Sequence, residues 1–446
     1  MSKIECSLGY LISYISRGIT PKYTEDFDNS CIVLNQKCIR NYVIDYIPSR
    51  RNNLQLRRIS GEKYIKKYDV LVNSTGVGTL GRTAQFLEDK NNIVVDSHVT
   101  IVRPDIKKIN PLFFGYLVKA KQSEIESLAE GSTGQTELSR DALRNIQLKF
   151  IADINLQREF AEFLLSIDKK IQLNTQINQT LEQIAQTIFK SWFIDFDPVH
   201  AKANALASGQ TLEQATQAAM AVISGKNTQE LHRLQTANPE QYQQLWEIAE
   251  AFPSGFDEEG VPWGWESKKV GEVAKIVKGK KPKLISSEPD DGFLPHILMA
   301  SLSGKYTEYA QIDKSIVCDI FDTLILMDGA ASGKIAIGHK GVIGSTFAKM
   351  ELSENKYWAL FNLFMFSKEQ DIQANTTGTS IPHTDKARVL DYEIIVPCDV
   401  VLNYFTEMYK NILCSILNQR KNSFILENIR DLLLPKLLSG EILNGN

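Results

Sequence analysis

The stretch LGYLISYISRGITPK, from Leu8 to Lys22, sets the organisation of this chain, because a variant of it returns as VGEVAKIVKGKKPK, from Val270 to Lys283. Both stretches begin with a hydrophobic residue and a glycine, continue with alternating apolar residues, and end with a basic residue, a glycine and then Pro-Lys. Alternation of this kind predicts a β-strand that runs into a turn. The return of the pattern indicates an internal duplication.

Two further matches follow in the same order in both halves. YDVLVNSTGVGTLGRTA, residues 68–84, matches FDTLILMDGAASGKIA, residues 321–336, and each is a short apolar strand before a glycine-rich loop. GSTGQTELSRDAL, residues 131–143, matches NTTGTSIPHTDKA, residues 375–387, and each is a Ser/Thr/Gly loop that leads into a polar segment. The shared order predicts a mixed α/β fold with two similar globular domains.

A long helical pattern follows each globular half, and its apolar residues step by four and three, which is a heptad seam. The first seam consists of Ile167, Ile171, Asn174, Asn178, Leu181, Ala185, Ile188 and Trp192. The second consists of Tyr409, Ile412, Ile416, Gln419, Ser423, Leu426, Arg430, Leu433 and Leu437. Ile177 and Ile184 would widen the first apolar face. Both seams are polar in the middle, and buried polar residues at such positions set register and partner choice. The two helices are therefore predicted to pair with each other; the alternative is that each packs on its own domain.

Length and charge are consistent with several domains and with contacts to a polyanion. The chain has 446 residues and a net charge of −3, and the length suggests two to three domains. Residues 50–67 contain seven basic residues and one acidic residue, as do residues 268–283, whereas residues 201–262 contain three basic and eight acidic residues. Two basic regions separated by an acidic one fit two contacts with a polyanion, and the alternative is a solvated lysine-rich surface.

The sequence matches no catalytic motif in full. The Asn/Asp-Pro-Pro-aromatic loop of a DNA adenine methyltransferase has no match, because Asn110-Pro111 and Asn238-Pro239 lack the second proline. The loop from Gly329 to Lys334 has one residue too few for a phosphate-binding loop. The six cysteines and six histidines show no metal-ligand spacing, so no metal site and no catalytic residue are predicted.

Three stretches resemble a known family. QLNTQINQTLEQIAQTIFKSWFIDFDPV, residues 172–199, looks like the central spacer of the specificity subunits of type I restriction-modification enzymes. LLLPKLLSGEI, residues 432–442, resembles the end of the second spacer, and PWGWESKKVGEV, residues 262–273, is similar to the entry into the second target-recognition domain.

The resemblance implies a non-catalytic subunit that reads double-stranded DNA. Each half would be a target-recognition domain for one part of a bipartite, asymmetric target. The helices would pair as an antiparallel coiled coil, set the gap between the two parts and dock two methyltransferase (modification) subunits. A restriction/translocase subunit would join them. Methyl donor, ATP and magnesium would belong to these partners, with no cofactor in this chain.

The predicted domains are 1–153 for target-recognition domain 1, 154–197 for the central spacer, 198–262 for an acidic helical connector, 263–399 for target-recognition domain 2 and 400–446 for the C-terminal spacer. The connector is longer than a minimal one, and no chemical role is predicted for it. The expected compartment is the cytoplasm, with no membrane association. The alternative function is a helical scaffold that binds proteins without sequence-specific DNA recognition.

The repeated loops and the basic turns supply the candidate DNA contacts, because Gly, Ser and Thr allow close approach and Arg and Lys bind phosphates and guanine. In the first half they are Arg17, Thr20, Lys22, Ser74, Thr75, Arg82, Ser132, Thr133, Gln135, Thr136 and Arg140. In the second half they are Lys278, Lys280, Lys281, Lys283, Ser332, Lys334, Thr377, Thr379, Ser380, His383 and Lys386. Gln135 suits adenine and Arg140 suits guanine, which makes them the better base-reading candidates. An ordinary turn or capping role is the alternative for each.

Overall fold

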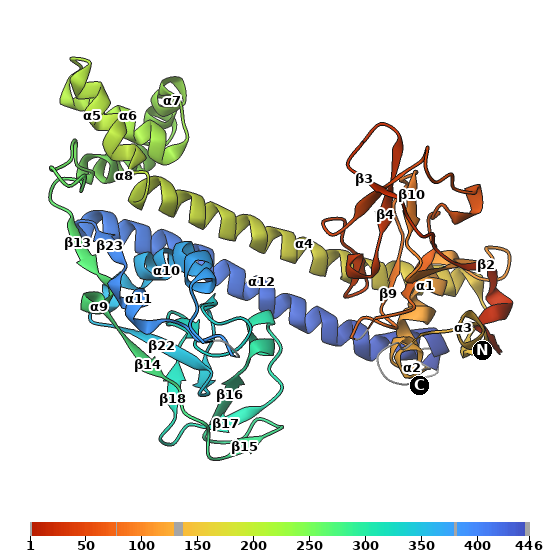
Figure 1. Ribbon diagram of the computed structural model, residues 1–446. Helices are drawn as coiled ribbons and strands as arrows, with labels where there is room; N and C mark the ends of the chain where they lie inside the picture. The colour runs from red at the N-terminus through yellow and green to blue at the C-terminus, as the bar shows by residue number, and fades with distance from the viewer. Residues whose placement is uncertain (1, 77, 129–136, 379–380, 442–446) are drawn as a thin grey trace. The chain divides into compact units, whose positions relative to one another are not determined.

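The computed structural model describes residues 2–76, 78–128, 137–378 and 381–441 (Figure 1). It divides into two compact units. Unit 1 contains Met1–Gln172 and Ile425–Asn446, and unit 2 contains Leu173–Phe424. Each unit holds one globular head together with parts of two long helices, α4 (Ile154–Phe193) and α12 (Asp399–Ser439).

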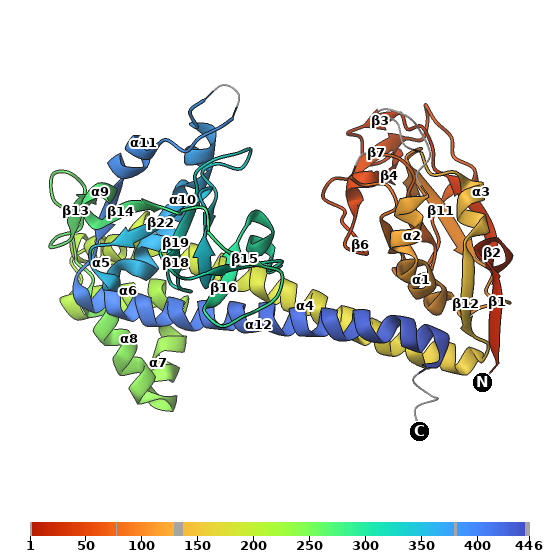
Figure 2. The same ribbon diagram turned by 90° about the horizontal axis from the view of Figure 1, so that it is seen from below.

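The head of unit 1 is built around an antiparallel sheet in the order β2-β11-β8-β9. Its strands are β2 (Ile12–Arg17), β11 (Val99–Pro104), β8 (Val70–Asn73) and β9 (Thr83–Gln85). A second sheet has the order β10-β4-β7-β3, formed by β10 (Ile93–Val95), β4 (Ser30–Leu34), β7 (Arg50–Asn53) and β3 (Tyr23–Thr24). The two strands that open and close the head pair antiparallel, and they are β1 (Lys3–Ser7) and β12 (Gln147–Ile151) (Figure 2).

The head of unit 2 repeats this topology. Its main sheet has the order β14-β22-β19-β20, formed by β14 (Ala274–Lys278), β22 (Phe347–Leu352), β19 (Thr323–Leu326) and β20 (Ile335–Ala336). Its second sheet has five strands, β15 (Ile285–Ser286), β17 (Tyr309–Gln311), β16 (Phe293–Ile297), β21 (Gly341–Ile343) and β18 (Ile316–Cys318). The opening and closing pair is β13 (Glu266–Lys269) with β23 (Glu393–Val396). The same strand order in both main sheets confirms the predicted duplication.

Two helices of each head occur at matching places. The first head contains α1 (Pro111–Ala120), α2 (Gln122–Ser127) and α3 (Arg140–Asn145), and the second head contains α9 (Val270–Val273), α10 (Trp358–Ala374) and α11 (Lys386–Asp391). Helix α1 follows the central strand β11, as α10 follows β22. Helix α3 leads into β12, as α11 leads into β23.

A glycine at the same repeated position lets two backbone segments touch in each head. A Cβ atom on Gly18, just after β2, would lie 2.0 Å from the carbonyl oxygen of Val95. A Cβ atom on Gly279, just after β14, would lie 2.2 Å from the carbonyl oxygen of Gly344. The Arg-Gly and Lys-Gly steps of the repeat are therefore packing constraints.

We expect Gly18→Ala to lower the free energy of unfolding by about 1–3 kcal/mol, because the new methyl group would overlap a carbonyl and force the backbone apart. Denaturant unfolding would measure the change. Gly61→Ala is the matched control in the same head, since a Cβ atom there has nothing within 4 Å. Equal destabilisation by both substitutions would contradict this role of Gly18.

The two long helices run antiparallel within each unit. In unit 2, residue numbers rise along α4 and fall along α12, since Asn174 Nδ2 donates to Ser423 Oγ (3.2 Å) and Asn178 Nδ2 donates to the carbonyl of Ile416 (3.3 Å). These contacts confirm the predicted pairing, and the polar seam residues Asn174 and Asn178 both donate to α12. The prediction that Ile184 widens the apolar face is wrong, because its side chain is 43% exposed.

The predicted seam residues lie on the inner side of the helices. Six of the apolar seam residues are buried: Ile167, Ala185, Trp192, Tyr409, Ile416 and Leu437. The other apolar seam residues are half-buried, namely Ile171, Leu181, Ile188, Ile412, Leu426 and Leu433. In unit 1 the seam continues into the core of the head, which combines apolar residues of α1, α4 and α12: Phe113, Phe114, Leu117, Ala161, Leu164, Leu434, Leu437 and Leu438.

The segment expected to be a connector is a bundle of four helices in unit 2 (Figure 1). They are α5 (Asp197–Ala207), α6 (Leu212–Ser224), α7 (Thr228–Ala237) and α8 (Pro239–Ala251). Asn238 and Pro239 separate α7 from α8, and the Asn238 side chain caps α8 by accepting from the backbone N–H of Gln241 (3.1 Å). The bundle shares one hydrophobic core with both long helices and with the second head, so it is an integral part of unit 2.

Candidate nucleic-acid interface

In the first head, Arg17 stands at the end of β2 and is held by the segment before α3. Its Nη2 donates to the carbonyl of Leu138 (3.1 Å), and its Nη1 forms an ion pair with Glu137. Glu137 also forms an isolated β-bridge with Thr75, whose Oγ1 lies 2.7 Å from Nδ1 of His98. Three of the predicted segments therefore meet at one place: the end of β2, the loop after β8 and the segment before α3.

Three further cations gather around this place, and with Arg17 they are called here the Lys63 cluster: Arg17, Arg57, Lys63 and Arg140. Lys63 Nζ donates to Ser16 Oγ (2.6 Å) and to the carbonyl of Arg17 (2.5 Å). Burial lowers the pKa of Lys63, and the positive charges of Arg140 and Arg57 lower it further. Repulsion of this kind marks a cluster with too few anions, and a polyanion would relieve it.

In the second head, Lys278 stands at the end of β14, the strand equivalent to β2. Its Nζ lies 2.8 Å from Asp328 Oδ2, and Asp328 Oδ1 lies 2.8 Å from Nδ1 of His383. Burial would raise the pKa of Asp328, but its hydrogen bonds with Lys278 and His383 outweigh burial and lower the pKa. We call Lys278, Asp328 and His383 the Lys278 cluster. Lys280, Lys281 and Lys283 follow it on an exposed turn.

The two clusters occupy equivalent positions in the duplicated fold. In both heads a cation ends the first strand of the main sheet. In both, the loop after the third strand forms a bridge with the loop before the last short helix: Thr75 with Glu137, and Asp328 with His383. Figure 2 shows α11, which follows His383, on the side of the second head that faces away from α12.

Two predicted contacts are corrected by the structure. Ser74 has no exposed surface, its Oγ lies 2.5 Å from Thr100 Oγ1, and it donates to the carbonyl of Val72 (3.3 Å). Ser332 is 2% exposed and lies 2.7 Å from the carbonyls of Gly329 and Pro382. Both hydroxyls hold their loops in shape and are not presented at the surface.

The other predicted residues divide into surface positions and positions outside the described residues. Thr20, Lys22, Arg140, Lys280, Lys281, Lys283, Thr377, His383 and Lys386 are exposed, and Thr75, Arg82 and Lys334 are half-buried. Ser132, Thr133, Gln135, Thr136, Thr379 and Ser380 lie outside the described residues. The candidate DNA contacts chosen from the sequence did not include Arg57 and Lys63, although the excess of positive charge over residues 50–67 indicated this segment.

The described part of the chain contains no group of three His, Cys, Asp or Glu residues that could hold a metal ion.

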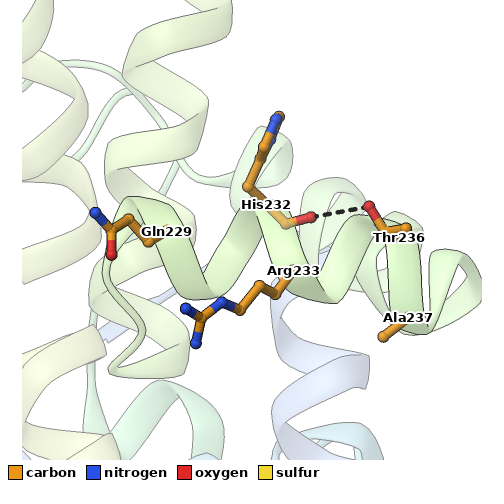
Figure 3. A pocket seen from close by; sticks show the side chains of 5 residues that line it. All are labelled: Gln229, His232, Arg233, Thr236 and Ala237. Carbon is orange, nitrogen blue, oxygen red and sulfur yellow. Dashed lines mark hydrogen bonds between the residues drawn. The ribbon is translucent and has the colours of Figure 1, made fainter.

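A pocket of about 750 Å³ lies on α7 and is lined by Gln229, His232, Arg233, Thr236 and Ala237 (Figure 3). The hydrogen bond drawn there, from Thr236 Oγ1 to the carbonyl of His232 (3.3 Å), lies within the helix. Of the helices that the structure describes, none is long and apolar enough to cross a membrane.

Comparison with known proteins identifies the family. The model of the type I restriction modification DNA specificity domain matches residues 27–183 and 262–399. The HindI specificity subunit of Haemophilus influenzae is 30% identical over 468 aligned residues, covering 97% of this chain and 99% of that protein. The MjaIX specificity subunit of Methanocaldococcus jannaschii is 23% identical and covers 97% of this chain and 91% of that protein.

The fold agrees with these matches. The crystal structure of a type I restriction-modification S subunit from M. genitalium superposes with a TM-score of 0.54 at 14% identity, covering 98% of this chain and 96% of that chain. The two repeated heads, the long helices and the match to the family over both heads lead to one conclusion: the chain belongs to the family of specificity subunits of type I restriction-modification enzymes, which are non-catalytic.

Proposed function

We propose that each head of this subunit reads one part of a bipartite, asymmetric DNA target. The observation that carries the proposal is a pair of cation-rich sites at equivalent positions of the two heads: the Lys63 cluster, and the Lys278 cluster together with the exposed Lys280, Lys281 and Lys283 that follow it. Equivalent positions favour equivalent roles, and positive charge favours the DNA backbone as ligand. The proposed domain bounds are residues 1–153 and 263–399 for the two readers.

The cationic side chains that form ion pairs within the head and those that are exposed to solvent suit different roles in DNA binding. Arg17 and Lys278 are held by Glu137 and Asp328, which suits side chains whose direction must be fixed. Arg57 and Arg140 are exposed, which suits contacts with phosphates. Arg140 stands at the first position of α3, where its guanidinium would also be able to form the bidentate contact that guanine accepts.

Exposed apolar residues on the long helices suit partner subunits. Within unit 1, Ile425, Ile429 and Leu432 of α12 are 44%, 40% and 68% exposed, and their spacing of four and three puts them on one face. Apolar stripes left open on a helix are typical of a protein interface. We assign the stripe to methyltransferase subunits, two in number, with a restriction/translocase subunit joining them. These partners would supply methyl donor, ATP and magnesium, and the complex would act in the cytoplasm, where its DNA lies.

Replacing residues 1–153 with the first head of another family member tests this function. We expect the complex with methyltransferase subunits to methylate a new sequence in one half of the target and the old sequence in the other half. Mapping methyladenine in host DNA measures this. The rival function, a scaffold that binds only proteins, predicts no sequence-selective methylation that follows the exchanged head, and an unchanged methylation pattern would favour it.

A further inference from the structure

A cluster of charged side chains joins the first head to both long helices within unit 1. Asp168 of α4 is its centre. Tyr116 Oη of α1 donates to Asp168 Oδ2 (2.8 Å), Lys119 Nζ of α1 lies 3.1 Å from the same oxygen, and Arg430 Nη1 of α12 donates to Oδ1 (2.8 Å). One carboxylate therefore connects three helices. Arg430 also donates from Nε to Asp431 Oδ1 (2.8 Å).

The cluster is shielded from water on most sides. The side chains of Lys119 and Arg430 are 8% and 12% exposed, and that of Asp168 is 28% exposed. Burial would raise the pKa of Asp168, but the charges of Lys119 and Arg430 outweigh it and lower that pKa. Burial lowers the pKa of Lys119, and Asp168 counteracts this effect. The carboxylate is thus the counter-charge that lets two buried cations stay side by side.

A hairpin of the head also reaches this cluster. Lys119 Nζ lies 4.3 Å from the ring centroid of Tyr42, which with Asn41 forms the turn between β5 (Ile39–Arg40) and β6 (Val43–Ile44). Tyr42 has a φ of +61°, and Asn41 before it has a φ of +52°. A positive φ is uncommon for an aromatic residue such as Tyr42, and the contact of its ring with Lys119 stabilises this turn.

Directional contacts of this kind can fix an orientation that apolar contacts leave loose. The core that head and helices share in unit 1 consists of apolar side chains, whose attraction depends little on direction. Charge-assisted hydrogen bonds need defined distances and angles. The second head is attached differently: Tyr409 of α12 donates to Asn362 Oδ1 of α10 (2.6 Å), and Asn362 Nδ2 donates to Thr323 Oγ1 (3.4 Å), so this buried polar link is uncharged.

We propose that Asp168 is a positioning residue that fixes the orientation of the first head on the two long helices and thereby restricts the gap between the two DNA half-sites that the complex accepts. This inference rests on the proposed function. A head that could change its orientation on the two helices would still recognise the sequence of its own half-site. It would, however, accept that half-site at more than one distance from the second half-site.

The test compares Asp168→Asn with the unchanged subunit, each co-expressed with methyltransferase subunits, by mapping methyladenine and counting the gap lengths of methylated sites. We expect both half-site sequences to be retained, and methylation of sites with a gap one base pair longer or shorter to rise about tenfold. Without the Asp168 carboxylate, Lys119 loses its hydrogen-bonded counter-charge and Arg430 keeps only Asp431, so the two buried cations repel each other more strongly and the head shifts. Glu162→Gln is the matched control, because Glu162 is an exposed carboxylate on the same helix.

Each outcome decides the matter. Gap broadening by Asp168→Asn, with none from Glu162→Gln and a narrow gap recovered in Asp168→Glu, supports the proposal. An unchanged single gap overturns it, and so does equal loss of methylation at every gap, because Asp168 would then be needed only for folding or assembly. Failure of the proposed function looks different: the unchanged subunit itself would then direct no bipartite methylation.

Discussion

Phe405→Ala should lower the free energy of unfolding of unit 2 by about 3–5 kcal/mol. Phe405 has no exposed surface, and its ring centroid lies 4.8 Å from that of Phe193 and 6.3 Å from that of Phe189. It belongs to the core that the four-helix bundle, both long helices and the second head share, so the cavity left by its ring would weaken all of them. Urea unfolding followed by tryptophan fluorescence reports the destabilisation, because the Trp192 ring lies 6.0 Å from Phe405.

Phe424→Ala is the control for this substitution. Phe424 lies on the same helix and is 50% exposed, so its replacement should change the free energy of unfolding by less than about 0.5 kcal/mol. Similar destabilisation by both substitutions would show that the ring at position 405 does not fill the shared core.

The double substitution Arg57→Ala/Arg140→Ala should weaken binding of the methyltransferase-bound subunit to all DNA sequences, by about tenfold for each arginine that binds a phosphate. Both arginines are exposed and lie near Lys63. Fewer counterions would be released on binding, so the negative slope of log association constant against log salt concentration should become less steep by about 1.8. Titration of labelled DNA at several salt concentrations measures both quantities.

Arg144→Ala/Lys169→Ala removes the same amount of charge elsewhere in unit 1 and is the control. Arg144 is exposed at the far end of α3, and Lys169 is exposed on α4. If the control lowered affinity and salt slope as much as the Lys63-cluster variant, general charge attraction would explain the binding and the cluster would not be a site. If Arg140 also contacts a base, Arg140→Ala alone should relax the sequence read at one position.

Much of the architecture could be predicted because it depends on patterns that are local in the chain. The repeat beginning at Leu8 and again at Val270 predicted two similar heads, and their main sheets share one strand order. The steps of four and three predicted the pairing of the long helices, including the polar positions Asn174 and Asn178. Periodicity reports which face of an element is apolar, and that face is what packs.

The candidate site was less predictable, because exposure depends on what the rest of the fold covers. Ser74 and Ser332 are residues of a type that binding loops often contain, yet both hydroxyls donate hydrogen bonds to neighbouring carbonyls. Arg57 and Lys63 stood in a basic segment, but only folding brings them beside Arg140. Composition shows that charge is present and does not show which charges meet.

The amino-acid order by itself determined the duplication, the heptad seams and the family, because each is a pattern repeated or matched along the chain. The tertiary structure decided which side chains are buried and which distant ones touch, such as Lys119, Asp168 and Arg430. It also made the segment after Asp197 part of a core. Such contacts join residues far apart in the chain, and close packing of the whole unit selects them, which no local pattern records.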